Sequence, residues 1–106
     1  MKGDELYLAQ IKDLIRKIES YVDGFDRAIF LTDEKTQSAL LLQLLLIEET
    51  AKKISNETRE RIHLPWKVII GFRDRAIHNY FDADLNIVWN TVKEDIPILK
   101  RELEDY

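Results

Sequence analysis

The stretch from Ala39 to Ile47 limits the fold of this chain more than any other. It reads ALLLQLLLI, so a helix through it is apolar around nearly its whole circumference. A surface helix of a small domain needs one apolar stripe, whereas a helix that is apolar all round must be covered all round. The rest of the chain could wrap it, or a second copy could cover it through a two-fold contact. For a domain of this size we favour the second copy.

The composition favours an all-α domain around this helix. The chain has 106 residues, 45% hydrophobic and 34% charged, with only three Gly and two Pro. Apolar residues recur every three or four positions through residues 4–24, which predicts a first helix that stops at Gly24. Thr32 or Asp33 is expected to cap a second helix that runs to about Asn56.

Two further helices are predicted in the second half. Pro65 suits the first turn of a third helix, and Asp82 or Asp84 suits the cap of a fourth. Pro97 is expected to break or kink the chain before a short last helix. The prediction is therefore one domain over residues 1–106, an antiparallel four-helix bundle with a short fifth C-terminal helix.

Charge and cysteine content restrict the class of function. The chain has no Cys, which excludes disulfides and thiolate chemistry and favours a reducing compartment. The polar start of the chain does not resemble a signal peptide, and no apolar run is long enough to span a bilayer, so we expect a cytoplasmic protein without membrane contact. The net charge of −4 disfavours indiscriminate nucleic-acid binding. Residues 52–78 nevertheless hold seven Lys or Arg against three acids, which indicates either a phosphate-binding surface or a solvated charged face.

This basic segment ends in the octet RDRAIHNY, residues 73–80. Cleavage of RNA without a metal requires a base for the 2′-hydroxyl, an acid for the leaving oxygen and positive charge at the phosphorane. Neutral His suits the first role, protonated His the second, and the planar fork of Arg matches phosphate oxygens. Two copies in a dimer would supply two histidines. By residue type alone, a hydrogen-bonded His at a helix end between solvated arginines remains the slightly favoured alternative.

Spacing alone selects particular companions for His78. On a continuous helix, at ~100° per residue, Arg73 and His78 lie about 140° apart. Asp74 and Arg75, four and three residues before His78, share its face. Asp74 is thus a candidate to orient the imidazole, and Arg75 a candidate to contact substrate. Arg73 joins them only if the helix ends near His78, or if a partner subunit brings its own Arg73.

Other kinds of site have weaker support. No Cys/His cluster or His-x3-His spacing indicates a metal, and no Gly-rich loop indicates a nucleotide cofactor, so neither is expected. His63 lies in a polar connection and is more simply an exposed loop residue. Trp66 and Trp89 lie on apolar stripes and are more simply core residues than base-stacking platforms.

The order Arg73-x4-His78-x-Tyr80 resembles the signature of the HEPN superfamily, in the HepT branch of toxins from MNT–HepT toxin–antitoxin pairs. The resemblance extends over nearly the whole chain, because four further blocks are similar and fall in the same order: residues 33–37, 47–52, 64–74 and 84–89. One departure is Glu48, which stands where this branch usually has Gly, and another is Thr50, which replaces Ala.

The resemblance implies a small helical bundle that forms a homodimer, with the two motifs facing a shared cleft. It implies a metal-independent endoribonuclease toxin of a type II or VII pair, with RNA as substrate and Arg73 and His78 as the catalytic pair. Asp74 matches the polar position after the arginine. Tyr80 matches the tyrosine to which the antitoxin, a minimal nucleotidyltransferase, transfers AMP, and the added phosphate would repel RNA.

A second function stays open at this point. The chain could be a non-catalytic helical module that binds and regulates a nucleotidyltransferase, as its acidic balance allows. RNA cleavage by the unmodified protein would distinguish the two.

Overall fold

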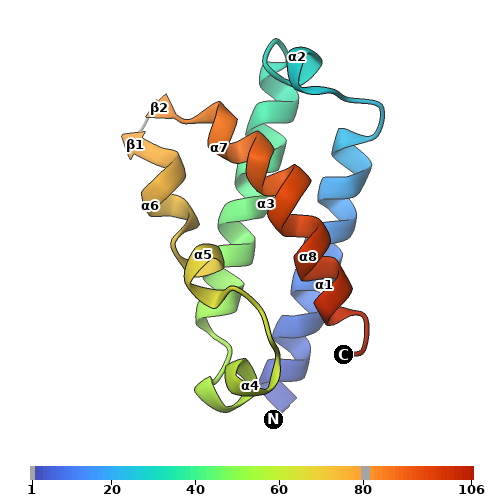
Figure 1. The fold of residues 1–106 in the computed structure, drawn as a ribbon, viewed down its shortest axis with the longest axis vertical. Helices are drawn as coiled ribbons and strands as arrows, with labels where there is room; N and C mark the ends of the chain where they lie inside the picture. The colour runs from blue at the N-terminus through green and yellow to red at the C-terminus, as the bar shows by residue number, and fades with distance from the viewer. Residues whose placement is uncertain (1, 80–81) are drawn as a thin grey trace.

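Two long antiparallel helices form the frame of the molecule (Figure 1). The computed structural model describes residues 2–79 and 82–106. Helix α1 spans Lys2–Val22 and helix α3 spans Glu34–Lys52, and the two pack side by side. Gly24 follows α1 with φ +79°, a left-handed conformation that favours glycine after a helix. The predicted stop of the first helix is thereby confirmed.

Short helices flank α3, and side-chain caps fix where they begin. Helix α2 spans Arg27–Phe30 and falls between α1 and α3 in the sequence. Asp33 caps α3 by accepting the backbone N–H of Thr36, as predicted. The second helix ends at Lys52 rather than near Asn56, because Ser55 caps a new helix α4, Asn56–Arg61.

The C-terminal third is one continuous helical rod, where a fourth helix and a separate fifth were predicted. Helix α7 (Leu85–Asn90), a π-helical turn η1 (Thr91–Asp95) and helix α8 (Ile96–Leu103) follow without a gap. Pro97 lies in the first turn of α8 and does not break the chain. Proline lacks an N–H and its ring crowds the carbonyl four residues earlier, and the wider π turn before it relieves both constraints.

The predicted third helix divides into three pieces. Helix α5 (Trp66–Ile70) and helix α6 (Phe72–Ala76) meet at Gly71, and strand β1 (Ile77–Asn79) pairs antiparallel with strand β2 (Asp82–Ala83). His78 therefore lies on a strand, and not on the continuous helix that the spacing argument assumed. The carbonyl of Ala76 accepts the N–H of Asp84 (2.6 Å). This carbonyl is therefore not available as the acceptor that the next turn of a longer helix would need.

The core lies between α1, α3, α6 and the rod, and the fold is all-α apart from the small hairpin. Within the long apolar run of α3, Leu40 and Leu44 are buried, whereas Leu42 is 53% and Leu46 40% exposed. The described chain therefore covers most of this helix but not all of it. No helix of the described residues is long and apolar enough to cross a membrane. The buried apolar residues of these elements are Leu8, Ile11, Leu14, Ile15, Ile18, Leu40, Leu44, Ile47, Ala51, Phe72, Ala76, Val88, Trp89, Val92, Ile96, Leu99 and Leu103.

Candidate active site

Arg73, Asp74 and His78 lie exposed around the junction between α6 and β1. The helix ends at Ala76, and Ile77 is extended (φ −114°, ψ 114°). The face-sharing argument for Asp74 and His78 therefore does not apply, because it requires a helix through His78. The structure instead meets the condition under which Arg73 can join His78, since the helix ends two residues before the imidazole.

Arg73 and Arg75 differ in the contacts that their guanidinium groups make. Nη2 of Arg75 donates to the carbonyl of Val68 on α5 at 2.9 Å. Burial raises the pKa of Asp95 in η1, and the charge of Arg75 partly offsets that effect, so Arg75 also faces the rod. The guanidinium of Arg73 makes no hydrogen bond or ion pair within the described part of the chain. The whole guanidinium of Arg73 is therefore available to a phosphate, whereas Arg75 already uses one of its donors.

Sequence reasoning missed one residue that contacts this segment. Glu48 of α3 is 3% exposed, and its Oε1 accepts the backbone N–H of Arg73 at 2.7 Å. Its other carboxylate oxygen lies 3.1 Å from Nζ of Lys52, one turn along the same helix. The only sign in the sequence was the replacement of the usual Gly by Glu48.

The other candidates are one exposed histidine, two tryptophans and one tyrosine. Tyr80 lies outside the described residues. His63 is exposed between α4 and α5. Trp89 is buried and stacks on Phe30, with ring centroids 5.1 Å apart. Nε1 of Trp66 donates to two backbone carbonyls at the end of α4. Trp89 is therefore a core residue, and Trp66 is half-buried and anchored to the end of α4.

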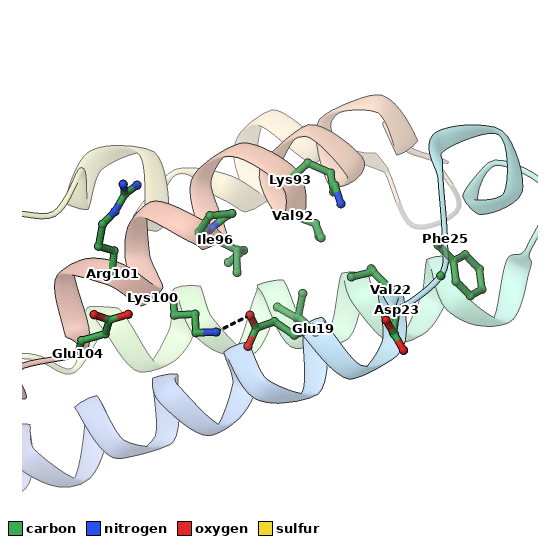
Figure 2. A pocket seen from close by; sticks show the side chains of 13 residues that line it. Glu19, Val22, Asp23, Phe25, Val92, Lys93, Ile96, Lys100, Arg101 and Glu104 are labelled. Carbon is green, nitrogen blue, oxygen red and sulfur yellow. Dashed lines mark hydrogen bonds and ion pairs between the residues drawn. The ribbon is translucent and has the colours of Figure 1, made fainter.

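The side chains of Arg73 and His78 are exposed at the surface of the described residues. A groove of about 690 Å³ lies between α1 and the rod, where Nζ of Lys100 meets Glu19 across a 2.8 Å ion pair (Figure 2). It is lined by cations and anions alike, and neither Arg73 nor His78 borders it. Among the described residues, no group of three or more His, Cys, Asp or Glu could hold a metal ion.

Comparison with known proteins assigns the family. The Ribonuclease HepT-like family model matches residues 11–106. The chain is 41% identical to "Probable ribonuclease HepT" of Thermococcus cleftensis, over 92% of this chain and 90% of that protein. It is 32% identical to a protein of Caldanaerobacter subterraneus that is named as an RNase, over 99% and 95% of the two chains. A Methanocaldococcus jannaschii protein, also named as an RNase, is 31% identical over 92% and 91%. No solved structure matches significantly. The chain therefore belongs to the HepT-like family of ribonucleases.

Proposed function

We propose that this chain is a metal-independent endoribonuclease in which Arg73 and His78 form the catalytic pair. The observation that carries the proposal is the guanidinium of Arg73, which has no partner among residues 2–79 and 82–106, on a helix that ends just before the exposed His78. A neutral imidazole takes the proton of the 2′-hydroxyl as this oxygen attacks phosphorus. A protonated imidazole then supplies a proton to the 5′-oxygen as its bond to phosphorus breaks. Arg73 donates to the phosphorane oxygens.

The other exposed groups of the segment have secondary roles in this proposal. Asp74 follows Arg73 in the sequence and is exposed, and we keep it in the proposal as a companion carboxylate of the site. Arg75 adds positive charge for RNA binding, but its hydrogen bond to Val68 makes it the lesser phosphate contact. Exposed groups at a surface can contact a long RNA chain, whereas small molecules usually bind in enclosed pockets.

The active form proposed here is a homodimer. Leu42 and Leu46 form an exposed apolar stripe on α3, which continues into a groove of about 430 Å³ against Ala9 and Leu14 of α1. A two-fold contact through α3 would cover this stripe. The dimer would supply two imidazoles, of which one can act as base and the other as acid.

The proposed setting is a cytoplasmic toxin–antitoxin pair with a nucleotidyltransferase antitoxin. Family membership supports this setting, and Tyr80 stands two residues after His78 in the sequence. AMP attached to Tyr80 would add a phosphate close to His78 in the sequence and would exclude RNA by charge and bulk. Intact mass after co-expression with the antitoxin tests this step, because Tyr80→Phe should abolish the gain of AMP.

Cleavage of defined RNAs in excess chelator tests the activity itself. The wild-type protein should cleave, and His78→Ala should lose at least about 100-fold in rate while keeping its fold. If the wild-type protein does not cleave, the non-catalytic binding module becomes the better assignment. If His78→Ala cleaves as fast as wild type, the catalytic pair is wrong.

A further inference from the structure

The buried carboxylate of Glu48 links helix α3 to the main chain of Arg73. Glu48 is 3% exposed, and burial of an ionised carboxylate is costly unless hydrogen bonds and a countercharge compensate it. Here the N–H of Arg73 donates to Oε1 at 2.7 Å, and Nζ of Lys52 lies 3.1 Å from Oε2. Both oxygens are thus engaged, and one of them is committed to the backbone of the proposed catalytic arginine.

The start of α6 explains why this contact is needed. The first N–H groups of a helix have no partner within the helix, and a side chain just before the helix usually accepts one of them. Gly71 precedes α6 and has no side chain to do so. Glu48 supplies the acceptor from a different helix, in a charge-assisted bond.

The turn before Arg73 leaves the main chain little freedom. A Cβ added at Gly71 would lie 2.9 Å from the carbonyl oxygen of Lys67, which is closer than real Cβ contacts. The N–H of Gly71 donates to the same carbonyl at 2.9 Å, and so closes the turn between α5 and α6. Arg73 is therefore fixed at its backbone, while its guanidinium is unpartnered among the described residues.

We propose that Glu48 is a positioning residue for RNA cleavage, which fixes Arg73 relative to α3 through the Arg73 N–H. This inference rests on the proposed function, because it takes Arg73 as the group that stabilises the phosphorane. Displacement of a catalytic group by about 1 Å can cost on the order of 100-fold in rate. Loss of the anchor should therefore lower kcat and leave KM nearly unchanged, since other cations still hold the RNA.

Three variants separate positioning from general stability. Glu48→Ala removes the acceptor and should lower kcat about 10- to 100-fold. Glu48→Gln keeps an oxygen that can accept the Arg73 N–H, so it should restore a large part of kcat. Glu60→Ala removes the same side chain from an exposed site on α4 and should leave kcat at the wild-type value. Measurements well below the lowest melting temperature ensure that all three variants are folded.

A spectroscopic readout reports the bond itself. The backbone amide of Arg73 should show a strongly downfield proton shift and slow hydrogen exchange in wild type and Glu48→Gln. Both should be lost in Glu48→Ala. If Glu48→Ala fails to fold, the comparison of wild type with Glu48→Gln in kcat and amide shift still decides. A Glu48→Gln protein that keeps the amide shift yet loses as much kcat as Arg73→Ala would overturn the proposal.

Arg73→Ala distinguishes failure of this inference from failure of the proposed function. If Arg73→Ala is inactive but Glu48→Ala keeps wild-type kcat, the positioning role is wrong and the catalytic pair stands. If Arg73→Ala remains fully active, the catalytic role of Arg73 is wrong, and the positioning role falls with it.

Discussion

At the scale of single residues, Arg73 and Arg75 differ in the hydrogen bonds that their side chains make. Arg75 donates to the Val68 carbonyl, whereas the guanidinium of Arg73 has no partner among the described residues. Arg73→Ala should therefore lower kcat/KM for RNA by at least about 100-fold, as the loss of a preorganised phosphate contact does. Arg75→Ala should cost less than about 10-fold in activity, with a lower melting temperature. Steady-state kinetics beside thermal unfolding checks both, and the reverse order would return the substrate-binding role to Arg75.

A second prediction at this scale concerns the buried Asp4. Hydrogen bonds from Ser55 and Thr58 lower the pKa of Asp4 to about 2. A carboxyl whose pKa is lower in the folded state stabilises the protein above its unfolded pKa, and this contribution is lost as pH falls toward the folded pKa. Wild type should be more stable than Asp4→Asn at pH 7, and the gap should narrow from pH 4 down to pH 2. Melting temperatures across this range test it, and a gap independent of pH would contradict it.

At the scale of elements, the sequence predicted the helix boundaries that depend on neighbouring residues better than those that depend on distant contacts. Asp33 and Gly24 act as the sequence indicates, because a cap or a left-handed glycine depends on a few neighbouring residues. The end of α6 at Ala76 was not predictable, since it depends on a hydrogen bond from Asp84 across the hairpin. The role of Glu48 was missed for the same reason, because its partner lies 25 residues away in the sequence.

The N-terminal cap of α7 can be tested with one variant at Asp84 and a control variant at Asp82. The carboxylate of Asp84 accepts the N–H groups of Asn86 and Ile87 at 3.0 and 3.2 Å, whereas Asp82, the other cap considered, lies exposed in β2. Asp84→Ala should lower the free energy of unfolding by about 1 kcal/mol. Asp82→Ala should change it by less than about 0.5 kcal/mol, as exposed substitutions do. Urea unfolding of both variants measures the difference, and equal effects would show that Asp84 is not an effective cap.

At the scale of the whole molecule, the apolar run of α3 is only partly covered by the described part of its own chain. Leu42 and Leu46 remain 53% and 40% exposed on α3, the same helix whose Glu48 holds Arg73. A dimer through this stripe would cover the helix and would supply the second imidazole that the proposed reaction uses. The apolar run and the basic octet of the sequence would then both contribute to the active dimer.

The double substitution Leu42→Glu with Leu46→Glu tests that link. Two carboxylates on the stripe would be buried without partners in a dimer, so the variant should be a folded monomer. Ile98→Glu, which changes a residue of α8 with 41% exposure, should stay dimeric. Light scattering after size exclusion gives the mass, and circular dichroism gives the helix content. RNA cleavage should fall with dissociation, because one chain supplies one imidazole while the proposed reaction uses two. A monomeric variant that cleaves at the wild-type rate would show that each chain carries a complete site.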